Sequence, residues 1–454
     1  MERTTAIEST ETVGKRVKLA GWVYARRDHG KLVFIDLRDR SGLVQIVGKE
    51  KLGKLRISDV IEVEGMVNKR PKEMVNPNLP TGELEIAVEK IRILAQSTDL
   101  PFDIQGDGYE IGEETRLKHR YLDLRRPRLV KNLELRHQTI KFIRDWLNNR
   151  GFIEIETPIL TKATPEGARD FVVPSRLQPG KFYALPQSPQ QYKQLLMVAG
   201  FEKYYQIARC FRDEDPRADR AYGEFTQLDL EMSFVTQEEI LKLTEALFTE
   251  LTEKVLQKKV FKKPFPRFSH QEAMKKFGAD KFDLRQKKDP NVVAFAWVLD
   301  FPLFEKTKER EISPSHHPFT APKDEDISLL DKEPMKVHSW QHDLVCNGLE
   351  VGGGSIRITD SGIQRKVFKI LGLSEEEIER KFGHLLKAFE FGVPPHGGIA
   401  PGIDRFLQAA LNESSIRELI AFPMTSGGQT AVMDAPSKLD PGQLKELRLK
   451  VIKR

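Results

Sequence analysis

Long apolar runs, cysteine and the common phosphate-binding motifs are all scarce in this sequence of 454 residues. No stretch approaches the roughly 18 consecutive apolar residues of a membrane span, and the opening MERTTAIEST lacks the apolar core of a signal peptide. We therefore expect a cytoplasmic protein with no membrane partner. Two cysteines, Cys210 and Cys346, are too few for a disulfide framework or a cysteine zinc site, and their apolar surroundings indicate core packing.

The sequence has no G-x-x-x-x-G-K-[ST] segment, nor a strand followed by G-x-G-x-x-G and a helix. Phosphate-loop and dinucleotide-binding folds are therefore disfavoured. With 39% apolar and 31% charged residues the composition is that of a globular protein, and the length exceeds what one hydrophobic core usually supports. The net charge of +6 permits a polyanionic partner without requiring one.

Residues 1–104 are expected to form an N-terminal domain. Alternating apolar and polar residues predict five strands, over 17–27, 31–39, 42–48, 60–68 and 83–94. Five short strands suit a closed β-barrel of the OB-fold type. One face and its loops combine charge, a stacking ring and an amide, from Arg26, Arg27, Lys31, Phe34 and Gln45. This mixture favours nucleic-acid binding, although a purely structural barrel explains the strands equally well.

Residues 105–130 are expected to be a hinge or linker, because the segment is polar, bears glycine at its start and is basic at its end. A solvated surface is the simpler interpretation. Residues 131–454 then form a second domain that mixes antiparallel strands with helices, so the fold class is α+β. Helical spacing predicts a helix over 236–256, and Pro158 in FIEIETPIL marks a sheet edge or an interface.

The segment CFRDEDPRADRAYGEFTQLDLEMSF, residues 210–234, predicts a hairpin with one charged and one apolar face. Successive side chains of a strand point to opposite faces. Arg212 therefore shares a face with Glu214, and on the second strand one face carries Phe225, Gln227, Asp229 and Glu231. The opposite face carries Leu228, Leu230 and Met232. A solvent-facing sheet gives the same pattern, but the ring among the charges, and loop arginines able to reach a phosphate, Arg217 and Arg220, favour a site.

The segment HDLVCNGLEVGGGSIRI predicts a second hairpin, because Asn347-Gly348 is a strong type I′ turn signal. Cys346 then pairs with Leu349 and Val345 with Glu350, which places Asp343 and Glu350 roughly 7 Å apart or closer. Two carboxylates at this spacing suit a Mg²⁺ ion that also binds phosphate. Two exposed acids are the alternative. Arg357 falls on the other face unless the run Gly352–Gly354 holds a bulge.

The segment GGIAPGIDRFLQAAL, residues 397–411, places glycines beside an apolar strand, where a flat ligand can approach the backbone. Arg405 opens the helix that follows. It is positioned to clamp a triphosphate, or to pair with Asp404 or another acid.

Together these segments resemble a known family. FRDEDPRADR and EFTQLDLEMSF, GFIEIETPIL, and GIAPGIDRFL are similar to motifs 2, 1 and 3 of class II aminoacyl-tRNA synthetases. More narrowly, RYLDLRRP, TKATPEGARDF, FYALPQSPQQYKQLL, HHPFTAPKD and NGLEVGGGSIRI resemble bacterial-type aspartyl-tRNA synthetases. The resemblance implies an N-terminal OB-fold barrel that binds the anticodon and a class II catalytic domain whose antiparallel sheet is flanked by helices.

The sequence departs from this family at three places. The domain that bacterial members insert in the catalytic half is missing near residues 286–292, Pro401 stands where motif 3 usually has an aromatic residue, and the motif 2 loop at RAYGEF differs in length. No motif residue lies within the gap. The resemblance therefore still implies an active enzyme.

The resemblance assigns residues to ATP and its metal ion. Arg212 would hold the α-phosphate, Phe225 would stack on the adenine, and Glu214 would contact the adenine side. Arg405 would grip the γ-phosphate, and Asp343 and Glu350 would hold Mg²⁺. On this assignment Arg212, Glu350 and Arg405 are the catalytic residues.

The resemblance also assigns residues to L-aspartate. Asp229 and Ser188 would lie near the ammonium group, while Gln190 and Gln227 would position the backbone. Lys193 and Arg357 would bind the side-chain carboxylate, with His316 or His317 closing over it. Glu166 would sit on a loop that closes over bound substrate.

The implied activity is that of an aspartate–tRNA ligase: aspartate and ATP form aspartyl-adenylate, and the aspartyl group then passes to tRNA. Arg27, Phe34 and Gln45 would read the anticodon of tRNA-Asp, and the enzyme would be a homodimer. One alternative is a relaxed enzyme that also charges tRNA-Asn, which His29 in the loop ARRDHGK suggests. The other is an inactive RNA-binding protein on the same scaffold.

Overall fold

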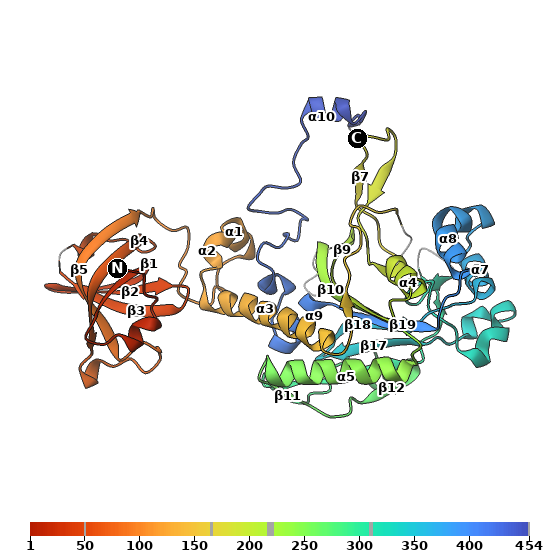
Figure 1. Cartoon of the computed structure of the whole chain (residues 1–454), viewed down its shortest axis with the longest axis horizontal. Coiled ribbons are helices and arrows are strands. Elements are labelled where there is room, and N and C mark those ends of the chain that lie inside the picture. Colours follow the sequence, from red (N-terminus) through yellow and green to blue (C-terminus); the bar gives the residue numbers. More distant parts are fainter. Residues whose placement is uncertain (50, 164–166, 216–221, 308–311, 453–454) are drawn as a thin grey trace. The chain divides into compact units, whose positions relative to one another are not determined.

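The structure is a computed structural model that describes residues 1–49, 51–163, 167–215, 222–307 and 312–452. It divides into two compact units, Met1–Ile111 and Gly112–Arg454 (Figure 1). Within the described residues, no helix is both long enough and apolar enough to cross a membrane.

The first unit is a closed five-stranded barrel in the order β1-β2-β3-β5-β4. Its strands are β1 (Arg16–His29), β2 (Leu32–Asp39), β3 (Gly42–Gly48), β4 (Val60–Lys69) and β5 (Leu84–Ala95). Alternate apolar side chains fill the interior, among them Val23, Ile35 and Ile46, each at most 1% exposed. The OB-type barrel predicted from the alternation is confirmed.

The second unit is built on an eight-stranded sheet in the order β12-β14-β17-β18-β19-β10-β9-β6. These strands are β6 (Ile153–Glu154), β9 (Lys203–Arg212), β10 (Gly223–Ser233), β12 (Arg267–Ser269), β14 (Phe295–Leu299), β17 (Gln341–Cys346), β18 (Leu349–Ile356) and β19 (His396–Pro401). Neighbouring strands from β14 to β9 are antiparallel, whereas the pairs at the two ends, β12 with β14 and β6 with β9, are parallel. The expected antiparallel sheet is therefore mixed at its edges, and Pro158 follows the edge strand β6.

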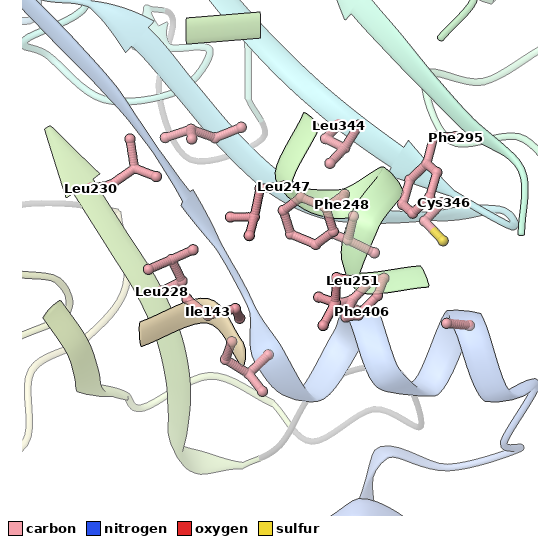
Figure 2. Close-up of a cluster of buried hydrophobic side chains, with 14 of the residues drawn as sticks. Ile143, Leu228, Leu230, Leu247, Phe248, Leu251, Phe295, Leu344, Cys346 and Phe406 are labelled. Atoms are coloured by element: carbon pink, nitrogen blue, oxygen red, sulfur yellow. The ribbon is translucent and has the colours of Figure 1, made fainter. Parts of the chain in front are cut away.

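Three helices cover one face of this sheet: α3 (Pro127–Asn148), α5 (Gln237–Lys254) and α9 (Ile403–Leu411). Figure 1 shows α5 running along the sheet. Their apolar side chains form one core with the apolar half of β10, including Leu228 and Leu230 (Figure 2). Thr236 and Glu239 form the capping box that starts α5, close to the predicted residue 236. The opposite face of the sheet remains for polar groups.

The other elements of the second unit flank the sheet. The helices are α1 (Glu113–Lys118), α2 (Arg120–Asp123), α4 (Gln190–Val198), α6 (His270–Phe277), α7 (Ser361–Ile370), α8 (Glu375–Phe389) and α10 (Pro441–Glu446). The short strands are β7 (Val172–Pro174), β8 (Phe182–Ala184), β11 (Lys259–Val260), β13 (Val292–Val293), β15 (Phe304–Glu305) and β16 (Ser313–Pro314).

The expected linker over residues 105–130 differs from the structure in its second half. From Gly112 onward it belongs to the second unit and folds into α1, α2 and the start of α3. Asp123 is fully buried and accepts hydrogen bonds from Arg120 and Arg126 at 2.7 and 2.8 Å, and from Arg116 at 3.3 Å. The interpretation as a solvated surface is wrong, because these charged side chains are buried and bonded to one another inside the protein.

The Asp123→Asn variant is expected to lower the free energy of unfolding by about 3 kcal/mol or more, because it leaves buried guanidinium groups without their shared carboxylate. Urea unfolding followed by circular dichroism measures the change. Asp145→Asn is the matched control, since Asp145 is 60% exposed and pairs with Lys141 at the surface; it should cost less than about 1 kcal/mol. Equal losses in the two variants would contradict the prediction.

Candidate active site

A cavity of about 230 Å³ opens among the polar side chains of the second unit. It gathers most residues that the sequence assigned to ATP and aspartate: Ser188, Gln190, Lys193, Arg212, Glu214, Phe225, Gln227, Asp229, His316, His317, Glu350, Arg357 and Arg405. Glu166 lies outside the described residues, as do the loop arginines Arg217 and Arg220. Asp343 lies beside the cavity, next to Gly353 of its lining.

The predicted hairpin supplies one wall of the cavity. β9 and β10 pair so that Arg212 lies opposite Gly223. Alternation along β10 turns Phe225, Gln227 and Asp229 towards the cavity, as expected. The guanidinium carbon of Arg212 lies 4.9 Å from the centre of the Phe225 ring. A cation for phosphate and a flat surface for a base are therefore neighbours.

Four buried charges form a cluster at the cavity: Lys193, Asp229 and Arg357 line it, and Glu231 pairs with two of them. Lys193 Nζ contacts carboxylate oxygens of Asp229 and Glu231 at 3.0 and 3.2 Å. Arg357 donates two hydrogen bonds to Glu231, at 2.8 and 3.0 Å. All four side chains are at most 3% exposed. The cluster is neutral overall, which is the condition for burying charge without a large penalty.

Glu231 received no role from the resemblance, yet it joins both cations. The signal was present in the sequence, because Glu231 occupies the same face of the strand as Asp229. Gly398 makes room for it: a Cβ on that glycine would lie 2.2 Å from Glu231 Oε2. The glycine beside this apolar strand therefore accommodates a carboxylate.

The two carboxylates differ in protonation behaviour. Burial raises the pKa of Asp229, although Lys193 opposes the rise. Burial also disfavours the charged form of Glu231, but Arg357 and Lys193 outweigh it and lower the pKa of Glu231 to about 2. Asp229 Oδ2 is held by Lys193, while its buried Oδ1 accepts no hydrogen bond from the described residues. One acceptor of the cluster is thus available to a ligand.

Two adjacent histidines close the side of the cavity near Arg357. The Arg357 guanidinium lies 2.6 Å from His317 Nε2, to which it donates. The rings of His316 and His317 are 4.4 Å apart. Burial, reinforced by Arg357, lowers the pKa of His316 to about 3. Burial together with His316 lowers the pKa of His317 well below its usual value, so both rings are neutral at pH 7.

The second predicted hairpin forms with a bulge. Asn347 and Gly348 have φ of +48° and +93°, and Cys346 pairs with Leu349 and Val345 with Glu350, as predicted. Val351 is then an extra residue, so that Asp343 pairs with Gly353. This bulge, one residue before the glycine run, shifts the alternation of β18 and brings Glu350 and Arg357 to one cavity.

The carboxylates of Asp343 and Glu350 have the chemistry of a magnesium site. Burial and the neighbouring charge of Glu350 raise the pKa of Asp343 well above its usual value. A Cβ on Gly353 would lie 3.2 Å from Asp343 Oδ1, so the glycine leaves space there. The described residues contain no cluster of three or more metal-ligating side chains. Two carboxylates fit Mg²⁺, which commonly takes its remaining ligands from water and phosphate.

Arg405 lies at the start of α9 and faces Glu350. It donates to the backbone carbonyl of Glu350 at 3.0 Å and lies 3.9 Å from the Oε2 atom of that side chain. Asp404 instead pairs with Arg136 and accepts a hydrogen bond from the Thr226 backbone. Arg405 therefore contacts Glu350, and Asp404 pairs with Arg136.

Residues around the start of α4 complete the cavity. The Gln190 backbone donates to Ser188 Oγ at 3.2 Å, and the Gln190 side chain donates to Gln194 at 3.0 Å. Gln227 accepts a hydrogen bond from buried Cys210 at 3.4 Å. Both cysteines are buried thiols, as expected.

The expected anticodon residues lie together on the barrel of the first unit. Arg27 forms two hydrogen bonds with Asp36, at 2.9 and 3.0 Å, and a weaker one with Gln45. His29 packs its ring edge-to-face on Phe34, with centres 5.6 Å apart. The barrel therefore places a cation, a buried amide and an aromatic pair on adjacent strands.

Comparison with known families covers both units. Residues 17–94 match the OB-fold nucleic acid binding domain, and residues 112–426 match tRNA synthetases class II (D, K and N). The chain belongs to the class II tRNA synthetases of the D, K and N group.

Curated relatives of this synthetase extend over nearly its whole length. It is 42% identical to the aspartate–tRNA(Asp/Asn) ligase of Rubrobacter xylanophilus, covering 96% of this chain and 94% of the relative. It is 43% identical to the enzyme of the same name from Dictyoglomus turgidum, covering 98% and 97%. Among solved structures, asparaginyl-tRNA synthetase from Pyrococcus horikoshii in complex with asparaginyl-adenylate has a TM-score of 0.75 and 25% identity, covering 97% of this chain and all of that one.

The Rubrobacter alignment spans 569 positions, more than the 454 residues of this synthetase, so the relative carries residues that are absent here. Near residues 286–292, where the inserted domain of the family was predicted to be missing, the structure has a short connector. Arg285 holds it closed by donating to the Asp289 and Val292 carbonyls at 3.2 and 3.1 Å, and to Asn412 Oδ1 at 3.1 Å. The connector is therefore anchored to α9 without the inserted domain.

Acidification from pH 6.5 to 5.5 is expected to lower the free energy of unfolding of this synthetase. Burial, followed by Arg357, lowers the pKa of both His316 and His342 to about 3. On acidification the unfolded chain therefore binds protons at a higher pH than the folded protein does. The free energy of unfolding falls as the pH is lowered from about 6.5 towards 3. Each of the two histidines accounts for about 1 kcal/mol of the loss between pH 6.5 and 5.5.

Urea unfolding at the two pH values measures this loss. His342→Gln should remove about 1 kcal/mol of it, whereas the control His137→Gln, at an exposed position of α3, should leave it unchanged. A pH dependence that is the same in both variants would contradict the assignment.

Proposed function

We propose that this synthetase is an aspartate–tRNA ligase that forms aspartyl-adenylate from L-aspartate and ATP and transfers the aspartyl group to tRNA. The observation that carries the proposal is the buried pair Lys193 and Arg357 at the end of the cavity, with Asp229 beside it. Two cations there suit a second carboxylate on the amino acid. The side-chain amide of asparagine would point its N–H donors at these two cations, which cannot accept a hydrogen bond. Selection of aspartate over asparagine by polar groups of this kind reaches roughly 10⁴.

The ammonium group of aspartate has a matching acceptor. Asp229 Oδ1 is buried and accepts no hydrogen bond from the described residues, and a charged donor would supply one. Ser188 and Gln190 line the same cavity and support the amino-acid backbone together with Gln227. His317, already bonded to Arg357, fixes the guanidinium for the side-chain carboxylate, and His316 lies beside it.

Adenylate formation needs no nucleophile from the protein, because the aspartate α-carboxylate attacks the α-phosphorus of ATP and diphosphate leaves. The enzyme has to align the two reactants and stabilise negative charge on the phosphates. Arg212 carries the charge for the α-phosphate, and Phe225 stacks on the adenine, with Glu214 nearby. Arg405 binds the γ-phosphate. This division explains why the cavity contains arginines and carboxylates and needs no catalytic serine or cysteine.

Asp343 and Glu350 are the residues that would hold Mg²⁺, since their donors fit that ion. When bound, the ion neutralises charge on the triphosphate oxygens. The buried Asp343 carboxylate lies against Gly353. The side-chain amide of Gln341 donates a hydrogen bond to this carboxylate at 3.2 Å and so fixes the orientation of the carboxylate.

The barrel is the proposed anticodon-binding surface, through Arg27, Phe34 and Gln45. The curated relatives described above are named for both tRNA-Asp and tRNA-Asn, which supports relaxed recognition, and His29 lies against Phe34 where such recognition would act. We therefore propose that both tRNAs are charged. The proposed location is the cytoplasm, where tRNA charging takes place.

The test is transfer of radioactive aspartate by the purified protein to tRNA-Asp and, separately, to tRNA-Asn, with ATP and Mg²⁺ present. Charging of both is expected. Charging of tRNA-Asp alone would leave the ligase activity in place and overturn the relaxed recognition. Charging of neither would support the inactive RNA-binding scaffold.

The same assay tests the amino-acid site. Arg357→Leu should lower kcat/KM for aspartate roughly 10³-fold or more, because the substrate carboxylate and Glu231 both lose a buried partner. Arg365→Leu is the matched control, since Arg365 lies on α7 and pairs with Glu375. Equal activity in the two variants would contradict the assignment.

A homodimer is also proposed, because the sheet edge at β6 leaves large apolar side chains in solvent. Ile153, Ile159 and Leu160 are 52%, 48% and 53% exposed. Light scattering should give twice the mass of one chain, and Leu160→Lys should give a single chain, because a buried lysine would lack a partner. Leu177→Lys, at a side chain 77% exposed, is the control and should leave the mass unchanged. A wild-type protein with the mass of one chain would overturn the proposal.

A further inference from the structure

Lys281 contacts one of the two carboxylates of the magnesium site. Its Nζ lies 2.9 Å from Glu350 Oε2, the same oxygen that Arg405 approaches to 3.9 Å. Lys281 belongs to the segment after α6, which no motif of the sequence assigned to ATP. The Lys281 side chain is 39% exposed, so solvent reaches it.

Neighbouring side chains fix the segment that carries Lys281. Phe282 is 7% exposed and stacks on Phe277 of α6, with ring centres 3.9 Å apart. Asp283 accepts hydrogen bonds from the Arg285 side chain, the closest at 2.8 Å, and lies against Gly348 of the β17–β18 turn. Lys281 therefore reaches Glu350 from an anchored backbone and not from a freely moving loop.

Surface ion pairs of lysine usually contribute little, and this pair would be unremarkable on an open surface. Here the carboxylate that Lys281 contacts belongs to Glu350, which lies beside the buried Asp343 and has a side chain only 25% exposed. An ammonium group and a divalent cation repel each other strongly at one carboxylate oxygen in such surroundings. Lys281 and the metal ion therefore compete for Glu350. When ATP binds together with the metal ion, its triphosphate brings negative charge next to Lys281 and Arg405.

We propose that Lys281 is a positioning residue of the ATP site, which holds the Glu350 carboxylate while the nucleotide is absent and moves to the triphosphate when the metal ion arrives with ATP. The proposal rests on the proposed function, since it takes Asp343 and Glu350 as the metal ligands. It makes metal binding depend on ATP: the enzyme without nucleotide binds a divalent cation weakly, because binding requires displacement of Lys281.

The first experiment measures Mn²⁺ binding to the full-length protein without ATP, by electron paramagnetic resonance of the free ion. Lys281→Met is expected to bind Mn²⁺ about tenfold more tightly than the wild type, and Lys281→Arg, which keeps the charge, should behave as the wild type. The double variant Lys281→Met, Glu350→Gln should lose the gain. Lys287→Met, at an exposed lysine of the connector, is the matched control and should leave binding unchanged.

The second experiment measures aspartate-dependent exchange between ATP and diphosphate. Lys281→Met is expected to raise the KM for ATP several-fold with kcat within about twofold, because the lost contact is with the bound nucleotide in both ground and transition states. A merely structural role would lower kcat and stability and leave Mn²⁺ affinity unchanged.

Unchanged Mn²⁺ affinity in Lys281→Met overturns the inference, as does a gain that persists in the double variant. A wild-type protein without aspartate-dependent exchange instead overturns the proposed function. The manganese measurement needs neither aspartate nor tRNA, so in that case it still decides for or against the role of Lys281.

Discussion

The neutral cluster of Lys193, Arg357, Asp229 and Glu231 is the constraint on which the site depends. Each of these side chains is almost fully buried, and removal of any one would leave the cluster with an uncompensated buried charge. Glu231 is bonded to both cations and so fixes the positions of the two groups proposed to bind aspartate. The geometry that selects the amino acid is thus held by ion pairs that exist before the substrate arrives.

The sheet separates this cluster from the hydrophobic core. Leu228 and Leu230 of β10 enter the core that packs against α5 (Figure 2). Asp229, between them in sequence, lines the cavity, and Glu231 pairs with Lys193 and Arg357. One strand therefore supplies both the packing that stabilises the unit and the charges that give it chemistry. A shift of β10 by one residue would exchange the two sets, so packing of the core fixes the register of the site.

The short connector near residues 286–292 is closed by its own hydrogen bonds. Arg285 closes the connector by hydrogen bonds to its own segment and to Asn412, just beyond α9. Lys281, which contacts Glu350, lies a few residues before Arg285 in the sequence. The connector, where the sequence predicts that the inserted domain is missing, therefore adjoins the site proposed for metal and phosphate, while Glu231 lies on β10.

The sequence by itself determined the barrel and the two hairpins, because strand alternation and the Asn347-Gly348 turn are local signals. Cavity residues outside the hairpins, such as Lys193 and His317, were predicted only from the resemblance to a known family. Tertiary structure alone decided three things. The bulge at Val351, which brings Glu350 and Arg357 to one cavity, depends on how β17 and β18 pack. The burial of Asp123 depends on arginines that close around it. The contact of Lys281 with Glu350 joins residues of distant segments. No local pattern encodes such contacts, since the free energy that sets them comes from packing and charge balance between separate elements.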